Sequence, residues 1–329
     1  MRNILNSATR NRKFNILTSP THERYQSNLD CTNAEYYLFQ SDGIKDWKNE
    51  YAKLPENHFI LPKNYIPYGI NFDFVLSQNK FGQYQKFISI SKALNIPLLS
   101  LEHCMPDFRW SVQNRQQVAN MRGDLNLYIT NYSRNAWGDD KGIIIPHCIN
   151  TEIFTPLLRS KRNNTILTVN NDYIQRDYCL GFKQFQRATK GLPVTIVGDT
   201  PGLSKAAKNI EELVNFYQTS SIFINCAHWS PIPMSLLEAL SSGCACVSIN
   251  ACAISEYIEH GINGFLAKND EEMRYYLELL LKNEDLATKL GNNARKTIVE
   301  KCSKEKFTNT WNNIFKSLHE NQIRFRKNT

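Results

Sequence analysis

The sequence lacks long hydrophobic runs, and this absence excludes one broad class of protein. No apolar run in the 329 residues approaches the ~20 needed to span a bilayer, and the N-terminus has no continuous apolar segment typical of a signal peptide. The nine cysteines include no CxxC pair and no His/Cys spacing that suits zinc, and several lie in apolar stretches, where a thiol behaves as a small hydrophobe. We therefore expect a cytoplasmic protein with neither structural disulfides nor a metal site.

The chain also has little excess of either charge outside its two ends. Its net charge is +8, but seven basic residues lie in 1–13 and 321–329, which contain no acid, so the rest has a net charge of +1. A net charge of +1 argues only weakly for a groove that binds a polyanion. The basic ends nevertheless suit a peripheral contact with a membrane or DNA. Apolar residues make up 42% and charged residues 21%, which excludes a disordered chain or a coiled coil.

Short β-type segments alternate with helical segments along most of the chain. The expected strands are 14–18, 72–77, 96–101, 125–130 and 142–146, then 165–170, 194–197, 221–225 and 245–249. The expected helices are 81–94 and 108–121, then 180–188, 211–217, 234–240, 271–281, 284–301 and 307–318. Strands of this length that alternate with helices indicate parallel sheets covered on both faces.

A polar and basic stretch near residue 155 separates two such series. We predict a flexible basic tail over 1–13, a first α/β domain over 14–154, a second over 155–305, and a C-terminal helix and basic tail over 306–329 that packs back on the first domain. Two α/β domains joined by one linker place a cleft between the carboxyl ends of their sheets, where ligands bind in such folds. Periodicity alone does not select a reaction.

One segment carries a chemical signal of its own. Pro231 and Pro233 precede a helix that begins near Met234, and proline at a helix start loses no hydrogen bond. The amides of Met234 and Ser235, together with the helix dipole, form an anion site of the kind that a diphosphate uses. Glu238, further along the helix, has the chemistry to accept hydrogen bonds from a ribose diol. Its alternative role is to complement the helix dipole.

The run around Glu238 resembles the donor-binding signature of the GT-B retaining glycosyltransferases of family 4, the glycosyl transferase group 1 family. The matching residues are Leu237-Glu238-Ala239, Gly243, Cys246-Val247, Glu256, Gly261, Gly264 and Phe265. Three upstream segments are also similar to the family: 146–150 with Phe154, 165–171 with Arg176, and 194–199. The resemblance covers 142–300 well and 14–141 only in outline. It implies a GT-B fold, in which two Rossmann-like domains with parallel sheets face a central cleft.

The resemblance also implies roles for individual residues. Glu238 would hold the nucleotide ribose, and Arg176 would neutralise the leaving diphosphate, which gains charge in the transition state. His103 matches a histidine that lies against the donor sugar. The other implied donor-binding residues are Ser230, Ile232, Met234, Ser235, Asn171 and Gly198. The alternatives are that Arg176 is solvated in a polar turn and that His103 packs under its loop.

The sequence departs from the family pattern in three places. Ser230 stands where the family has a Glu, so either the donor sugar is atypical, or the backbone of this turn suffices, or activity is lost. The Gly-rich loop after the first strand is replaced by the polar segment 18–27, which either contacts acceptor or donor through Thr21, His22 and Arg24 or is a solvated turn. The basic residue expected after the linker strand is also missing, since asparagines fill 170–171.

These observations predict a metal-independent retaining glycosyltransferase that has no cofactor and uses a nucleoside-diphosphate sugar, with UDP favoured over GDP. The sequence has no Asp-x-Asp pair, which agrees with metal independence in this family. The acceptor is a hydroxyl of a glycan, of a lipid-linked or other cell-envelope molecule, or of a hydroxylated DNA base. Arg109, Arg115 and Arg122 are the candidate basic residues of an acceptor surface. A sugar-nucleotide epimerase of the same fold and a catalytically degenerate binding protein are the alternatives.

Overall fold

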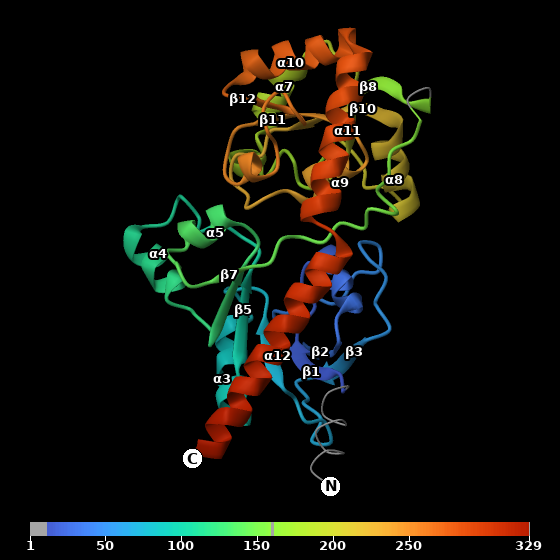
Figure 1. The fold of residues 1–329 in the computed structure, drawn as a ribbon. Helices are drawn as coiled ribbons and strands as arrows, with labels where there is room; N and C mark the ends of the chain where they lie inside the picture. Colours follow the sequence, from blue (N-terminus) through green and yellow to red (C-terminus); the bar gives the residue numbers. More distant parts are fainter. Residues whose placement is uncertain (1–11, 159–160, 329) are drawn as a thin grey trace. The chain divides into compact units, whose positions relative to one another are not determined.

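Two parallel β-sheets organise the chain, each in its own compact unit (Figure 1). The computed structural model describes residues 12–158 and 161–328, and of residues 321–328 it describes the backbone only. The first unit comprises the chain up to Ile129, Arg134–Ile145 and the C-terminal helix from Lys304. The second unit comprises Thr130–Ser133 and Pro146–Ser303.

The sheet of the first unit has seven strands in the order β3-β2-β1-β4-β5-β6-β7, and every neighbouring pair is parallel. The strands are β1 (Phe14–Thr18), β2 (Ala34–Gln40), β3 (His58–Lys63), β4 (Phe74–Ser77), β5 (Leu98–Glu102), β6 (Leu125–Tyr128) and β7 (Ile143–Ile144). Because all strands run the same way, the loops that follow them meet at one edge of the sheet. The sequence predicts five of these strands and misses β2 and β3.

Helices cover both faces of this sheet. The helices of this unit are α2 (Glu23–Gln26), η1 (Ser27–Cys31), α3 (Tyr84–Leu94), α4 (Val112–Ala119) and α12 (Lys304–Asn328), and α5 (Asn131–Ala136) begins in the second unit and ends in the first. On one face, Tyr84 and Phe87 of α3 pack with strand residues such as Val75. On the other, the Phe315 ring of α12 lies 5.8 Å from the rings of Phe14 and Phe74. The completely buried Phe315 side chain contributes roughly 1.5–3 kcal/mol, which fixes α12 to the first sheet.

The sheet of the second unit has five parallel strands in the order β12-β11-β10-β8-β9. The strands are β8 (Asn163–Val169), β9 (Val194–Val197), β10 (Ser220–Asn225), β11 (Ala245–Ile249) and β12 (Phe265–Ala267). The helices are α6 (Asp177–Leu180), α7 (Phe182–Thr189), α8 (Ile210–Thr219), α9 (Met234–Ser241), η3 (Ile254–Glu256), α10 (Asp270–Lys282) and α11 (Glu284–Lys301). Ile166, Ile222 and Val247 pack in one core with α7 and α10. The expected class of two parallel α/β sheets is therefore confirmed.

The structure also bears on the expectations about the chain ends, cysteines and membranes. Residues 1–11 of the predicted tail lie outside the described residues, while Arg12 forms an ion pair with Asp73 and Lys13 lies 3.6 Å from Glu35. None of the nine cysteines, all of which fall within the described ranges, forms a disulfide. No helix in the described part of the chain has the length and apolar character required to span a bilayer.

Candidate functional site

The predicted donor-binding residues follow the carboxyl ends of β8, β9 and β10, which share one edge of the second sheet. Asn171 follows β8, and its side-chain Oδ1 accepts a hydrogen bond from the Asp199 amide in the next loop at 2.8 Å. Gly198 ends β9 with φ +124°, and a Cβ there would lie 2.0 Å from the Asn170 carbonyl oxygen. Only glycine permits this approach, so Gly198 holds the β8 and β9 loops together.

Helix α9 begins at this edge, as the sequence predicts. Pro233 precedes the helix in an extended conformation, and Met234 and Ser235 form its first turn with their side chains partly exposed. Their amides stand at the helix start, where the i→i−4 ladder supplies no acceptor. Ile232 is buried, at 3% exposure, so it supports the turn from below. The turn thus offers a diphosphate its backbone amides and the positive end of the dipole.

Glu238 lies on the buried side of α9. Its side chain is 1% exposed, and its Oε2 accepts a hydrogen bond from the Tyr217 hydroxyl at 3.0 Å. Tyr217 belongs to α8 and packs edge-on against Phe154, with ring centroids 5.8 Å apart. The hydrogen bond from the neutral Tyr217 hydroxyl fixes the orientation of this buried carboxylate. Sequence reasoning identifies Glu238 but misses Tyr217, because a tyrosine in an amphipathic helix gives no local signal of this contact.

The turn that carries Ser230 is anchored on α6. The amides of His228 and Trp229 both donate to the Cys179 carbonyl, at 3.0 and 3.2 Å. The His228 imidazole Nε2 also lies 2.9 Å from the Tyr178 carbonyl oxygen. Arg176 precedes α6 directly and has an exposed side chain. The fold therefore brings the segment of Arg176 and the Ser230 turn together at the same edge.

Glu256, another residue of the family-like run, has a structural contact within the second unit. Its carboxylate accepts hydrogen bonds from the amides of Asn131 and Tyr132, at 3.3 and 2.9 Å. The Lys301 ammonium donates to its carbonyl oxygen at 2.5 Å. Glu256 thus holds the segment Thr130–Ser133 to the C-terminal end of α11.

In the first unit, the loops after β1, β4 and β5 bring His103 and His22 together. The two imidazole rings lie 4.4 Å apart, and the Tyr25 ring lies 4.6 Å from His103. His103 Nε2 is 3.3 Å from Gln78 Oε1, and the Gln78 amide nitrogen donates to the Thr18 hydroxyl at 3.4 Å. His103 is therefore held in a polar cluster at the carboxyl edge of its sheet.

Thr21 and Arg24 lie in the loop that replaces the expected Gly-rich turn. The Thr21 hydroxyl accepts a hydrogen bond from the buried amide of Gln83, and the Thr21 backbone amide donates to Gln26 Oε1 at 3.0 Å. Arg24 is half-buried within α2, and His22 has a left-handed conformation with φ 51°. Gln78 and Gln83 organise this loop, and neither gives a signal in the sequence.

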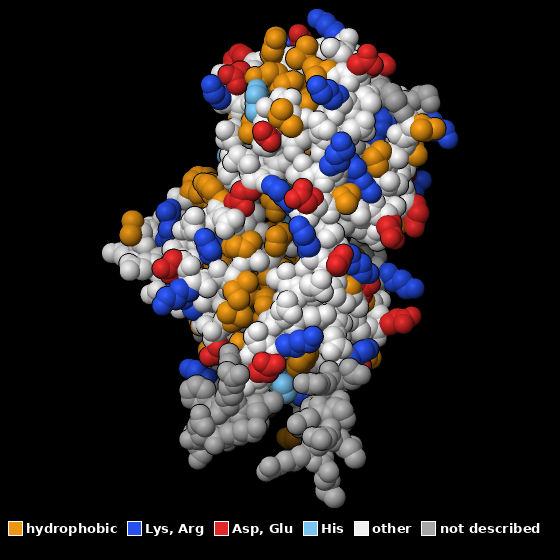
Figure 2. Space-filling model, in the orientation of Figure 1, with side chains coloured by type: hydrophobic (Ala, Val, Ile, Leu, Met, Phe, Trp, Pro, Cys, Tyr) orange, Lys and Arg blue, Asp and Glu red, His pale blue; other side chains and the backbone are white. Residues whose placement is uncertain are grey.

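The three candidate basic residues of the acceptor surface are exposed but largely engaged in local contacts. Arg109 forms a two-nitrogen ion pair with Asp107, and Arg122 donates to the Gly138 carbonyl at 2.8 Å and lies 3.6 Å from Asp139. Arg115 reaches the Phe108 carbonyl at 3.5 Å. On the face shown in Figure 2, acidic and basic side chains are interspersed. These contacts reduce the positive charge that the segment offers to a phosphate backbone.

No group of three His, Cys, Asp or Glu side chains among the described residues could hold a metal ion. The functional groups at the carboxyl edges of the two sheets include amides, hydroxyls, a carboxylate, an imidazole and a guanidinium.

The architecture, with two parallel α/β units, defines the GT-B fold class. Anabaena HepE, crystallised in complex with UDP, matches with a TM-score of 0.73 and 14% identity over 93% of this chain and 100% of that one. HepE in complex with UDP-glucose matches over 92% of this chain and 99% of that one, also with a TM-score of 0.73, at 13% identity. Sucrose-phosphate synthase of Thermosynechococcus elongatus matches with a TM-score of 0.73 and 12% identity, over 93% and 99% of the two chains.

Sequence comparison matches part of the chain to a known family. Residues 203–297 match the model of the glycosyl transferases group 1, a range that includes Ser230, Ile232, Met234, Ser235 and Glu238. An uncharacterized glycosyltransferase of Haemophilus influenzae is 29% identical over 178 residues, and the match spans 48% of this chain and half of that relative. The resemblance to the glycosyl transferase group 1 family that the sequence predicts is thus confirmed over residues 203–297.

Proposed function

We propose that the protein transfers a sugar from a UDP-linked donor to a hydroxyl acceptor with retention of configuration. The observation that carries this proposal is the start of α9, where amides with no acceptor in the helix ladder and Glu238 lie within the segment that matches the family model. HepE, which shares the fold, is described as binding UDP and UDP-glucose, and this favours uridine as the base.

In this proposal, the second unit grips the donor. The amides of Met234 and Ser235 bind the diphosphate, and the exposed Arg176 guanidinium adds a mobile positive charge. The ribose diol hydrogen-bonds to the Glu238 carboxylate, whose orientation is fixed by Tyr217. Gly198 and Asn171 shape the neighbouring loop.

The reaction requires positioning and charge stabilisation more than covalent help from the protein. The bond between the anomeric carbon and the diphosphate oxygen breaks as the acceptor oxygen bonds to that carbon on the same face. The acceptor proton passes to the leaving diphosphate oxygen. Arg176 stabilises the charge that develops on this oxygen, and the family resemblance assigns His103 a contact with the sugar.

The acceptor that we propose is a hydroxyl of a glycan or of another cell-envelope molecule. A hydroxylated DNA base is less favoured because Arg109 and Arg122 already have carboxylate neighbours. Binding to short duplexes that falls steeply between low and moderate salt would reverse this preference. A second candidate, a binding protein without transfer activity, is favoured by Ser230 in place of the family's first Glu.

Incubation of the full chain with a panel of UDP-sugars and GDP-sugars, with and without hydroxyl acceptors, tests the proposal. We expect acceptor-dependent release of UDP and an α-linked product from an α-linked donor. Conversion of the sugar nucleotide to an epimer without acceptor would identify the epimerase alternative. UDP binding with no turnover of any donor would identify the binding protein.

A further inference from the structure

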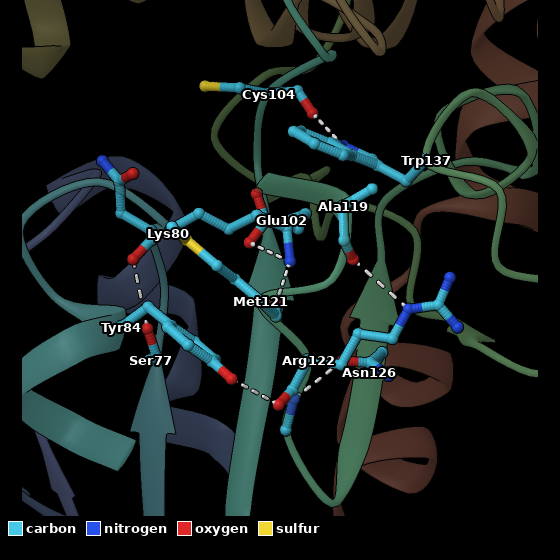
Figure 3. A network of polar contacts seen from close by, with 12 residues as sticks. Ser77, Lys80, Tyr84, Glu102, Cys104, Ala119, Met121, Arg122, Asn126 and Trp137 are labelled. Atoms are coloured by element: carbon cyan, nitrogen blue, oxygen red, sulfur yellow. Dashed lines mark hydrogen bonds and ion pairs between the residues drawn. The ribbon is translucent and has the colours of Figure 1, made fainter. Parts of the chain in front are cut away.

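Lys80 and Glu102 form a buried ion pair in the first unit (Figure 3). Lys80, in the loop after β4, and Glu102, the last residue of β5, are 2% and 4% exposed. The Lys80 ammonium lies 3.6 Å from Glu102 Oε1 and donates a hydrogen bond to the Met121 carbonyl. It also lies 5.3 Å from the centroid of the Trp137 ring. One lysine thus contacts three other segments of the chain, at Glu102, Met121 and Trp137.

Stability does not explain this pair. Removing two charges from water is costly, and a buried ion pair can often be replaced by apolar residues of similar volume without loss. Here the cost is visible: burial raises the pKa of Glu102 to about 7 and lowers the pKa of Lys80. Glu102 Oε1 accepts no hydrogen bond from the residues that the structure describes. An apolar pair would fill the same space at lower cost.

The residues around the ion pair connect it to His103. Glu102 directly precedes His103, and Lys80 lies two residues after Gln78, the residue that contacts the His103 imidazole. On the other side of His103, the Cys104 carbonyl accepts a hydrogen bond from the Trp137 indole at 2.9 Å. His103 is therefore fixed from both neighbours, through Lys80 on one side and through the ring that Lys80 packs against on the other.

A second contact extends this support to the segment that follows α4. The Tyr84 hydroxyl of α3 donates to the Arg122 carbonyl at 2.7 Å, one residue after the carbonyl that Lys80 holds. Lys80 and Tyr84 thus hold the segment after α4 at two adjacent peptide groups, Met121 and Arg122. All of these contacts lie within the first unit.

We propose that Lys80 and Glu102 are positioning residues that hold the His103 backbone in register with Gln78 and so fix the orientation of the imidazole. Neither residue touches substrate. Their effect on transfer rests on the proposed function, whereas their effect on the geometry of His103 does not.

The test uses the double variant Lys80→Met/Glu102→Leu in the full chain, because it removes both charges and leaves neither one buried alone. We expect the melting temperature and the UDP affinity to remain at the wild-type values. The kcat for transfer should fall at least about tenfold, as expected from a small misplacement of a reacting group. Asp73→Asn, which alters the Arg12 ion pair at the opposite edge of the same sheet, is the control and should keep the wild-type kcat.

A second readout is independent of activity. The NMR resonance of the His103 Cε1 proton, assigned by its loss in His103→Gln, should shift in the double variant and retain its position in Asp73→Asn. An unchanged resonance together with kcat within twofold of the wild type would overturn the positioning role. If the wild type transfers no sugar at all, the proposed function fails, and the resonance alone decides the role of Lys80 and Glu102. A double variant that unfolds would also contradict the proposal, because the pair would then be needed for stability.

Discussion

At the scale of the residue, the proposed chemistry depends most on the single exposed cation at the start of α6. Arg176 has an exposed side chain and lies beside the loops that carry Asn171 and Gly198. A flexible guanidinium at this edge can follow the diphosphate as charge accumulates on the leaving oxygen. Its contribution should therefore appear in the rate of transfer more than in the fold.

Arg176→Gln should lower the kcat for sugar transfer about 100-fold, the scale observed when one group that stabilises developing charge is removed. The melting temperature should not change, since the side chain is exposed. Steady-state kinetics with a saturating UDP-sugar measure the effect. Lys183→Gln, in the neighbouring helix α7, is the matched control because Lys183 is also an exposed cation. Equal kcat values in the two variants would remove Arg176 from the site.

A second residue sets a pH limit on stability. His58 is 3% exposed, stacks on Tyr36 with ring centroids 4.7 Å apart, and contacts Asn57 through Nδ1 at 2.9 Å. Burial lowers the pKa of His58 from 6.5 to about 3. The unfolded chain therefore binds a proton below pH 6.5 that the folded chain does not, and stability is lost as the pH falls.

From this shift, the wild type should lose about 2 kcal/mol of unfolding free energy between pH 7 and pH 5 through His58 alone. His58→Phe keeps the stacked ring and removes the titrating group. The unfolding free energy that this variant loses between pH 7 and pH 5 should therefore be about 2 kcal/mol smaller than the loss of the wild type. Urea denaturation at the two pH values measures the difference. A pH dependence equal to that of the wild type would show that another group dominates.

At the scale of the element, the donor edge depends on how closely the β8 and β9 loops approach. Gly198 and Gly202 both have positive φ, at +124° and +78°, and lie in the same loop. A Cβ at Gly198 would collide with the Asn170 backbone, whereas at Gly202 no atom lies within 4 Å. Substitution of Gly202 thus adds only the strain of the left-handed conformation, whereas substitution of Gly198 also adds the collision with Asn170.

Gly198→Ala should therefore be less stable than Gly202→Ala by about 2 kcal/mol, the typical cost of forcing apart a packed contact. It should also bind UDP more weakly, because the loop with Asn171 must move. Thermal unfolding and calorimetric titration with UDP measure the two effects. If both variants behave alike, loop approach is not what shapes this edge.

The elements that the sequence predicts are those with strong hydrophobic patterns. Strands such as 245–249 are buried on both faces and read as continuous apolar runs. The missed strand β2 contains Glu35 and the buried Gln40, and β3 is an edge strand with Pro62 inside it, so both depart from the expected pattern. Strand β12 has only three residues, too few for periodicity to show.

The candidate site likewise contains residues that the sequence indicates and residues that it does not. Residues with distinctive chemistry, such as His103 after β5 and Glu238 in α9, can be predicted from the sequence together with the family resemblance. Their partners Gln78 and Tyr217 cannot, because these contacts join residues 25 and 21 positions apart and depend on the packing of whole elements. The Lys80–Glu102 pair escapes sequence reasoning for the same reason.

At the scale of the whole molecule, we propose above all that the second unit binds a uridine nucleotide at α9. The most direct measurement is calorimetric titration of the full chain with UDP and GDP, and of Glu238→Gln with UDP. Glu238→Gln retains an acceptor for the Tyr217 hydroxyl and should fold. Glu278→Ala, a surface glutamate of α10, is the control. We predict that UDP binds more tightly than GDP. Glu238→Gln should weaken UDP binding about tenfold, since a hydrogen bond to a charged group contributes about 1.5–3 kcal/mol, whereas Glu278→Ala should not. Absence of UDP binding, or an unchanged affinity in Glu238→Gln, would contradict this proposal.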